Sequence, residues 1–522
     1  MDRQHMIDRL EAHREEWDIC IIGGGATGLG TAVDAASRGY STLLLEQCDF
    51  AKGTSSRSTK LVHGGVRYLQ QGNIKLVTEA LRERGLLRQN APHLVKDQSF
   101  IVPNYKWWEG PFYGIGLKIY DWMAGSLGLG PSRFLDKEET LALAPTLEDE
   151  GLRGGVLYHD GQFDDARLAI NLAATAAEQG GVLLNYVSVT GLLKTSGRIK
   201  GVQAKDTLTG KEYGIPAKTV INATGVFSDA VLRMDEPGHE SIIAPSQGIH
   251  LVFDKSFLPG SAAVLVPHTD DGRVLFAVPW HNRIIAGTTD TPMEPKDNAS
   301  LLEPRPLEEE IGFVLQTIGR YLTKDPTRGD IKSMFAGLRP LVKGNAKSTA
   351  ALSRDHHIEI SAAGLITITG GKWTTYRKMS EDVVDIAARQ AGLPEKECVT
   401  HHLHIHGWKK GVDFNSDSYY YGADEGGIDA LIKEQPPLAN PLHPQLPYTA
   451  AEIVWAVQNE LCMTVEDALS RRTRALLLDA RAAIEAAPAV AAIMSKQLQK
   501  DTAWEQGQVQ AFTTLARQYL PA

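Results

Sequence analysis

The stretch Asp18-Ile19-Cys20-Ile21-Ile22-Gly23-Gly24-Gly25-Ala26-Thr27-Gly28 joins an apolar run to three glycines spaced G-x-G-x-x-G. Small residues follow up to Arg38-Gly39, and the stretch Ser41-Thr42-Leu43-Leu44-Leu45 then ends on Glu46. This order predicts a strand, a tight turn, a helix and a second strand with an acid at its tip. Such a unit binds a dinucleotide, because its glycines allow the turn, the approach of a pyrophosphate and close packing of helix on strand. The residues expected to contact the dinucleotide here are Gly23, Gly25, Ala26, Thr27, Gly28 and Glu46.

The acid at the second strand narrows the choice of dinucleotide. The carboxylate of Glu46 can accept hydrogen bonds from both hydroxyls of an adenosine ribose, and it would repel the 2′-phosphate of NADP. The unpaired N–H groups of the helix N-terminus suit the phosphates. The motif alone does not separate FAD from NAD, but its position near the N-terminus and the later segments favour FAD.

The composition sets broad limits. The chain has 522 residues, 43% of them hydrophobic, which is typical of a globular protein with two or three domains. The net charge of −9 argues against nucleic acid as a partner. No apolar run reaches the ~18–20 residues of a membrane-spanning helix. The four scattered cysteines include no C-x-x-C pair, which indicates a reducing compartment.

The order of patterns along the chain predicts an α/β protein with a further helical domain. We expect a discontinuous FAD-binding domain made of residues 1–95, 156–240 and 336–395. A substrate-binding cap domain, mostly antiparallel β, would comprise residues 96–155 and 241–335. Residues 396–522 would form a mainly helical C-terminal domain. Because ligands of open α/β sheets lie at the carboxyl ends of strands, the substrate is expected between the first two domains.

A second glycine turn, Asn222-Ala223-Thr224-Gly225, follows the apolar pair Val220-Ile221. Taken alone it is an ordinary turn at the end of a strand. Together with the N-terminal unit it predicts a second place where the backbone runs close to FAD.

Several longer segments resemble the signature of FAD-dependent glycerol-3-phosphate dehydrogenases, and they occur in the order of that family. The resemblance covers about residues 17–390, and Arg471-Arg472-Thr473-Arg474 matches the family's helical domain more loosely. The segments are Thr54-Ser55-Ser56, Lys60–Leu69, Phe276–Trp280, Gly287–Asp290, Gly337–Leu341, Ser353–Asp355 and Gly370–Arg377.

The resemblance implies a fold related to D-amino-acid oxidase and the oxidation of sn-glycerol 3-phosphate to dihydroxyacetone phosphate. FAD would take the hydride, and electrons would then pass to a membrane quinone. The further FAD contacts expected from the resemblance are Thr54, Ser55, Ser56, Lys60, His63, Gly64, Gly65, Ala223, Thr224, Gly225, Gly371, Lys372 and Thr374.

A phosphate dianion requires charged donors, and the forked guanidinium of arginine suits it best. By resemblance, Arg67 and Tyr68 line the substrate site, while Arg339 and Lys372 bind the phosphate or the nearby hydroxyls. Arg354 is a further candidate, although it stands beside Asp355 and could equally be paired locally. Any one of these arginines could instead be an ordinary surface residue.

Oxidation of an alcohol also needs a base, and histidine titrates near neutral pH. His63 and His250 both stand in the family's motifs. The resemblance places His250 against the substrate, so we expect His250 and Arg339 to be the catalytic residues and His63 to contact the flavin or hold its loop.

Three other patterns have competing interpretations. Alternation in 401–406 would place His402, His404 and His406 on one strand face, but without partners at ligand spacing we expect no metal. The aromatic stretch 107–113 is either core of the cap domain or a membrane contact, since tryptophan and tyrosine favour interfaces. Arg471, Arg472 and Arg474 could contact anionic lipid, although a basic cluster on a helix is usually a solvated face.

The function expected is therefore a quinone-linked glycerol-3-phosphate dehydrogenase, bound peripherally to the inner face of a cytoplasmic membrane, with a homodimer as one option. A glycerophosphate oxidase that uses oxygen is the nearest alternative. A flavoprotein without catalytic activity and an amine or amino-acid oxidase of the same fold also remain open.

Overall fold

The computed structural model describes residues 1–65, 73–267, 269, 274–294, 297–343 and 355–521. Its N-terminal unit consists of β1 (Trp17–Ile22), α2 (Ala26–Ser37) and β2 (Thr42–Leu45). Strand β1 pairs in parallel with β2 and, on its other side, with β10 (Glu212–Asn222). The predicted strand–turn–helix–strand unit is confirmed, with Glu46 directly after β2.

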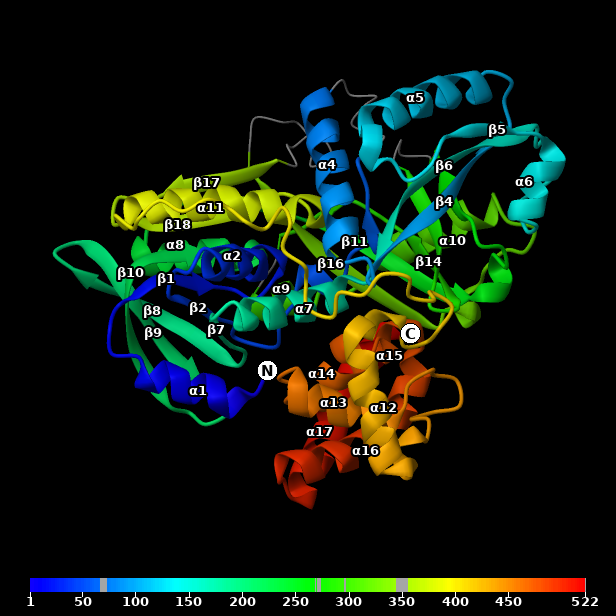
Figure 1. Cartoon of the computed structure of the whole chain (residues 1–522). Coiled ribbons are helices and arrows are strands. Elements are labelled where there is room, and N and C mark those ends of the chain that lie inside the picture. Colours follow the sequence, from blue (N-terminus) through cyan, green and yellow to red (C-terminus); the bar gives the residue numbers. More distant parts are fainter. Residues whose placement is uncertain (66–72, 268, 270–273, 295–296, 344–354, 522) are drawn as a thin grey trace.

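The first sheet has the strand order β17-β18-β10-β1-β2-β7 (Figure 1). β7 (Val182–Leu184) and β18 (Leu365–Gly370) join in parallel, whereas β17 (His356–Ile360) is antiparallel to β18. The hairpin β8 (Val187–Thr195) and β9 (Arg198–Asp206) continues from the amino-terminal half of β10.

Side chains of β1 alternate between two cores. Ile19 and Ile21 pack with helices α2, α7 (Asp165–Glu178) and α11 (Tyr376–Gln390). Cys20 and Ile22 pack on the other face with α1 (Arg3–Ala12), the β8–β9 hairpin and α8 (Ser228–Asp235). Because both faces are covered, the residues at the centre of β1 and β2 are mostly apolar, as is typical of parallel sheets.

The second sheet is mostly antiparallel and has the order β15-β11-β14-β13-β12-β4-β6-β3, with β16 paired to β11 and β5 to β6. Helix α10 (Glu308–Gly319) packs against one of its faces in a separate core. The strands are β3 (Leu61–Val62), β4 (Val95–Asn104), β5 (Arg133–Leu135), β6 (Gly154–Phe163), β11 (Ile243–Asp254), β12 (Ala263–Val266), β13 (Leu275–Trp280), β14 (Arg283–Gly287), β15 (Thr291–Pro292) and β16 (Ser333–Val342).

Three strands of this sheet run across the domain boundaries that the sequence suggests, beginning with β4, which starts at Val95. β6 includes residues 156–163 and β16 includes residues 336–342, both of which the sequence places in the FAD-binding domain. The chain therefore passes repeatedly between the two sheets, and the residue boundaries of the domains stay predictions.

Helices outside the two sheets complete the fold. α4 (Ile74–Asn90), α5 (Glu109–Ala124) and α6 (Lys137–Leu143) lie beside the second sheet, and α9 (Asn298–Leu302) precedes α10. The C-terminal helices form a bundle below both sheets (Figure 1). They are α12 (Glu425–Glu434), α13 (Ala450–Asn459), α14 (Val465–Asp467), α15 (Ala475–Leu478), α16 (Ala480–Leu498) and α17 (Thr502–Ala516).

The basic cluster of this bundle is neither a solvated face nor a lipid contact. Arg471 and Arg472 donate to the carboxylate of Asp49 at 2.6 and 2.7 Å, and Arg474 pairs with Asp164 at 2.7 Å. All three guanidinium groups are buried. Both interpretations were wrong because the cluster faces carboxylates of the FAD-binding domain, which the sequence cannot place opposite it.

The histidine-rich segment forms no strand, so its alternation carries no meaning. His404 stacks on Trp408 with ring centroids 4.0 Å apart. His406 lies between two carboxylates, Glu178 at 2.5 Å and Asp424 at 2.8 Å.

Among the helices in the described residues, none combines the length and the apolar character needed to span a lipid bilayer.

Candidate functional site

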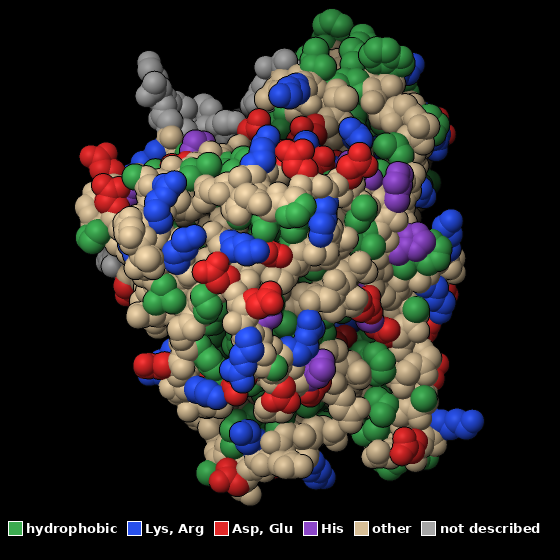
Figure 2. All heavy atoms as spheres, turned by 60° about the vertical axis from the view of Figure 1, so that its left-hand side comes forward, with side chains coloured by type: hydrophobic (Ala, Val, Ile, Leu, Met, Phe, Trp, Pro, Cys, Tyr) green, Lys and Arg blue, Asp and Glu red, His purple; other side chains and the backbone are tan. Residues whose placement is uncertain are grey.

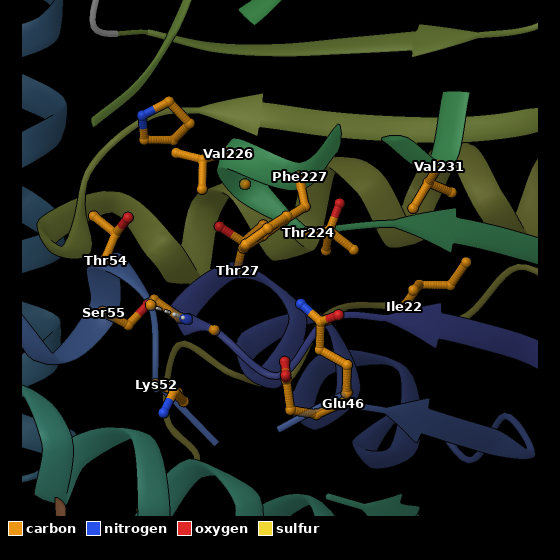
Figure 3. A pocket seen from close by; sticks show the side chains of 18 of the residues that line it. Ile22, Thr27, Glu46, Lys52, Thr54, Ser55, Thr224, Val226, Phe227 and Val231 are labelled. Atoms are coloured by element: carbon orange, nitrogen blue, oxygen red, sulfur yellow. Dashed lines mark hydrogen bonds between the residues drawn. The ribbon is translucent and has the colours of Figure 1, made fainter. Parts of the chain in front are cut away.

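A cavity of about 370 Å³, which we call the nucleotide cavity, lies at the carboxyl ends of β1, β2 and β10 (Figure 3). It is lined by many of the residues that the sequence predicts as FAD contacts. These are Gly23, Gly25, Ala26, Thr27, Glu46, Thr54, Ser55, Ala223, Thr224, Gly225, Gly371 and Lys372. The two glycine turns, far apart in sequence, thus meet at one place, as the strand pairing of β1 with β10 requires.

Glycine is needed where these turns touch. Gly23 has a φ of +108°, and a Cβ added there would lie 2.7 Å from the carbonyl oxygen of Ala223. A Cβ on Gly28 would lie 1.8 Å from the carbonyl oxygen of Gly23. Any side chain at these positions would push the strand, the turn and helix α2 apart.

Glu46 is fixed at the edge of the nucleotide cavity. Its carboxylate accepts hydrogen bonds from the backbone N–H groups of Gly24 at 2.6 Å and Cys48 at 2.8 Å. Burial raises the pKa of Glu46, and these two N–H groups oppose that rise. A carboxylate has about four acceptor positions, so two hydrogen bonds leave capacity for ribose hydroxyls.

The N-terminus of α2 opens onto the same cavity. Its N-cap, Gly25, has no side chain to satisfy the first N–H groups, and the Ser55 hydroxyl accepts from Ala26 N at 2.9 Å. The remaining donors and the helix dipole suit a pyrophosphate. The residues present therefore fit the adenosine and pyrophosphate parts of FAD.

The other predicted FAD contacts lie away from the nucleotide cavity. Gly28 packs inside the turn, and the Ser56 hydroxyl donates to the carbonyl of Ala51. His63 N donates to Thr374 Oγ1 at 3.2 Å, and Gly64 N donates to the hydroxyl of Tyr120. Their roles stay predictions, as does that of Gly65.

The side chain of Lys60 binds protein groups, and its predicted contact with FAD stays a prediction. The ammonium group is fully buried and donates to Asp165 at 2.7 Å and to the carbonyl of Ser56 at 2.6 Å. It lies 5.2 Å from the ring centroid of Phe335. The ammonium group of Lys60 is therefore bound by oxygen atoms of the protein, close to a residue of β16.

The second sheet brings His250 and Arg339 to one face. In the pairing of β11 with β16, His250 lies opposite Phe335, Gly248 opposite Gly337, and Ser246 opposite Arg339. Since side chains alternate along a strand, these six residues share one face of the sheet. The four that carry side chains all project from that face. The two glycines carry no side chains, and neighbouring groups occupy the space above them: Arg339 and Thr288 lie over Gly248, and the Arg57 backbone lies over Gly337.

Arg339 extends over the first of these glycines. A Cβ on Gly248 would lie 2.4 Å from Arg339 Nη2. The guanidinium donates to Thr288 Oγ1 at 3.1 Å and to the Thr289 carbonyl at 3.0 Å, and it lies 3.4 Å from Asp290. Gly248 and His250 are two residues apart on β11, so the guanidinium charge lies roughly 7 Å along the strand from His250.

His250 is buried, and its ring stacks on Phe335 with centroids 4.9 Å apart. Its Nε2 atom lies 2.9 Å from the hydroxyl of Thr59. Burial lowers the pKa of His250 well below its usual value, and the charges of Lys60 and Arg339 lower it further. This direction favours the neutral imidazole, the form that can accept a proton.

Lys372 lines the nucleotide cavity, so it reaches the boundary between the two sheets. Arg67, Tyr68 and Arg354 lie outside the described residues, and their predicted contacts with substrate stay predictions.

The glycines beside His250 and Arg339 were visible in the sequence, but sequence reasoning missed that Gly248 pairs with Gly337 and that the Thr59 hydroxyl lies beside His250. Gly248-Ile249-His250 and Gly337-Leu338-Arg339 share the spacing G-x-H and G-x-R, a signal that was present in the sequence. Trp373 was also missed: its indole N–H donates to the Ser55 carbonyl at 2.8 Å, across the nucleotide cavity.

Comparisons with known proteins agree with this geometry. The family model described as FAD dependent oxidoreductase matches residues 18–377, and one described as the C-terminal domain of alpha-glycerophosphate oxidase matches residues 367–505. Human mitochondrial glycerol-3-phosphate dehydrogenase is 40% identical over 97% of this chain and 73% of its own length. The Schizosaccharomyces pombe mitochondrial enzyme is 37% identical over 97% and 87%.

Among solved structures, glycerol-3-phosphate dehydrogenase from Bacillus halodurans complexed with FAD superposes with a TM-score of 0.80 and 29% identity. The match covers 99% of this chain and 98% of that one. Glycine oxidase from Geobacillus kaustophilus, 20% identical with a TM-score of 0.53, shares the fold of about three quarters of the chain. The chain belongs to the FAD-dependent glycerol-3-phosphate dehydrogenase family, and its cofactor is FAD.

Proposed function

We propose that this protein oxidises sn-glycerol 3-phosphate to dihydroxyacetone phosphate and delivers the electrons to a membrane quinone. The observation that carries the proposal is the placement of His250 and Arg339 on one face of the second sheet. A separation of roughly 7 Å is one that a three-carbon phosphate ester can span, with its phosphate at Arg339 and its C2 hydroxyl at His250.

Cationic residues of the chain would bind the phosphate, and a neutral residue would take the proton. Arg339 and Lys372 offer cations to the phosphate dianion, and the fixed guanidinium favours a substrate with charged oxygens. The neutral His250 takes the hydroxyl proton. FAD, when bound, supplies the hydride acceptor, chemistry that no side chain provides.

The decisive experiment is anaerobic mixing of the FAD-loaded protein with sn-glycerol 3-phosphate while the visible flavin band is followed. Bleaching, with recovery of the band on adding a quinone, is the expected result. A band that is unchanged by the substrate would overturn the assignment and favour a non-catalytic flavoprotein or an oxidase of amino acids.

The C-terminal family match, named for an oxidase, makes oxygen a second candidate acceptor. The reduced protein should therefore be mixed with oxygen and with quinone separately. Reoxidation that is fast with quinone and slow with oxygen supports a dehydrogenase. Rapid formation of peroxide without quinone would instead identify an oxidase.

A membrane contact through helix α5 fits a quinone acceptor. Phe112, Ile115, Ile119 and Trp122 follow one another at spacings of three or four residues and are 45–83% exposed, and Trp107 before the helix is 77% exposed. Figure 2 shows hydrophobic side chains gathered at the top of the molecule, the end at which Figure 1 places α5. Apolar faces flanked by tryptophan are typical of helices that lie in a membrane interface.

The membrane contact can be tested by sedimentation with vesicles of mixed zwitterionic and anionic lipids. Ile115→Ser with Trp122→Ser should reduce the bound fraction, because each removes apolar area from the interface. Ile360→Ser is the matched control, since Ile360 is 51% exposed on β17. Equal binding of all variants would exclude α5 as the contact. The homodimer stays a prediction.

A further inference from the structure

We propose that Thr59 is a positioning residue for the proton-transfer step: its hydroxyl accepts the Nε2–H of His250 and so leaves the lone pair of Nδ1 to act as the base. This inference rests on the proposed function of the same site. It goes further by naming the nitrogen that takes the proton and the residue that selects it.

The geometry holds the imidazole in a single orientation. Thr59 Oγ1 lies 2.9 Å from His250 Nε2, and the ring stacks nearly parallel on Phe335, with an interplanar angle of 19°. On the side toward β14, a Cβ on Gly287 would lie 2.5 Å from His250 Cδ2. The ring is thus confined by a hydrogen bond, an aromatic face and a neighbouring strand.

The two nitrogens of this ring have different surroundings. Within the part of the chain that the structure describes, Nδ1 is buried and has no hydrogen-bond partner, whereas Nε2 has Thr59. A neutral imidazole has one N–H and one lone pair. Placing the proton on Nδ1 would bury an unpaired donor and would leave no nitrogen free to act as a base. The Nε2–H form satisfies the donor and leaves the lone pair of Nδ1 without a donor of its own.

The turn that carries Thr59 is itself anchored from below. Asp165, at the start of α7, accepts from the Ser58 hydroxyl at 2.7 Å and from the Lys60 ammonium at 2.7 Å. Lys60 adopts a positive φ of 63° and also binds the Ser56 carbonyl. The residues on either side of Thr59 are therefore tied to one buried carboxylate. This arrangement fixes the hydroxyl relative to β11.

The proton balance of the step is simple. The C2 hydroxyl of the substrate gives its proton to Nδ1 of His250, while the hydride from C2 leaves to FAD. The resulting imidazolium carries protons on both nitrogens, and its Nε2–H remains donated to Thr59. The hydroxyl oxygen thus stabilises the charge that develops beside the cations Lys60 and Arg339, where an unsupported imidazolium would be unfavourable.

Thr59→Val tests this inference because valine keeps the shape and removes the hydroxyl. We expect flavin reduction to slow by about 10-fold to 10²-fold, with the substrate concentration at half-maximal rate changed less than about threefold. Thr59→Ser should restore most of the rate, since it returns the acceptor. Thr369→Val is the matched control, because Thr369 is buried and its hydroxyl has no partner among the described residues.

A second readout does not depend on turnover. In protein with 15N-labelled histidine, the signals of His250, assigned by their loss in His250→Asn, should show the Nε2–H form in the wild type and lose that preference in Thr59→Val. If Thr59→Val fails to retain FAD, Thr59→Ser and Thr59→Ala replace it in the same measurements.

The inference is overturned if Thr59→Val reduces flavin at the wild-type rate, if Thr59→Ser is as slow as Thr59→Val, or if His250 is protonated on Nδ1 in the wild type. A wild-type protein whose flavin does not respond to glycerol 3-phosphate would instead overturn the proposed function. The two failures are therefore distinguishable.

Discussion

Two regions of this molecule are rich in arginine and differ in what the arginines meet. At the junction between the C-terminal bundle and the first sheet, Arg471 and Arg472 share the carboxylate of Asp49, and both guanidinium groups are buried. On the face of the second sheet that carries His250, Arg339 is 22% exposed and contacts the Thr288 hydroxyl, the Thr289 carbonyl and, at 3.4 Å, Asp290. Guanidinium groups that are fully buried against carboxylates hold domains together, whereas a partly exposed guanidinium can also contact a ligand.

The junction also reaches the nucleotide cavity. Lys52, which lines the cavity, pairs with Glu466 of the bundle at 2.6 Å, and Glu466 in turn pairs with Arg471. Burial raises the pKa of Glu466, but Arg471 and Lys52 outweigh it and hold the pKa at about 2. The bundle therefore fixes the loop after β2, although it contributes no residue that lines the cavity.

The largest effect is expected from breaking the matched charges. Arg472→Met leaves the buried carboxylate of Asp49 short of one partner and the carbonyl of Glu460 without its guanidinium donor. We expect the free energy of unfolding to fall by about 3–5 kcal/mol, measured by chemical denaturation. The control is Arg88→Met, because Arg88 and Asp97 form an exposed pair that contributes at most about 1 kcal/mol. Equal stability of the two variants would contradict the structural role.

Removing the charge of Arg339, in the second of the two regions, should have a smaller effect, on substrate binding rather than on stability. Arg339→Met should raise KM for glycerol 3-phosphate about 10²-fold, because it removes charged hydrogen bonds to the phosphate. The unfolding transition and the FAD content should stay close to those of the wild type. Arg198→Met, at an exposed guanidinium bound to the Ala362 carbonyl, is the control. An unchanged KM would exclude Arg339 from phosphate binding.

The contrast between these regions also explains what the sequence could predict. The βαβ unit was predictable because its strands, turn and helix are contiguous in sequence. The hydrophobic periodicity of a strand also differs from that of a helix. The partners of Arg471 and Arg472 were not, because Asp49 stands more than 400 residues earlier and only the folded chain brings it there. The distance in sequence also hid the partner of Lys60. Its motif suggested a cofactor contact, whereas its ammonium group donates to Asp165, 105 residues away.

The aromatic insertion shows a third case, in which the signal was present but ambiguous. Apolar residues at 108, 112, 115, 119 and 122 are spaced as on one helix face. A sequence does not say whether such a face is covered by another element. In the structure Tyr113 and Tyr120 are buried, whereas Phe112 and Trp122 are exposed, so the helix has both a core side and a free side.

The smallest expected effect is on stability and depends on pH. It concerns His406, a partly exposed residue before the C-terminal bundle that lies between Glu178 and Asp424. Burial lowers the pKa of His406, but hydrogen bonds to Asp424 and Glu178 outweigh it and raise the pKa to about 9. A folded-state pKa above the unfolded value means that the stabilisation is complete below about pH 6.5 and is lost as pH rises toward 9.

His406→Asn should therefore lower the free energy of unfolding by roughly 2 kcal/mol at pH 6, and the difference from the wild type should shrink above pH 9. Thermal unfolding of both proteins at pH 6 and pH 9.5 measures this change. His404→Asn is the matched control, because His404 stacks on Trp408 instead of bridging carboxylates. A deficit for His406→Asn that is equal at the two pH values would show that the residue acts by packing. The junction would then be held by the matched arginine and aspartate charges without help from this histidine.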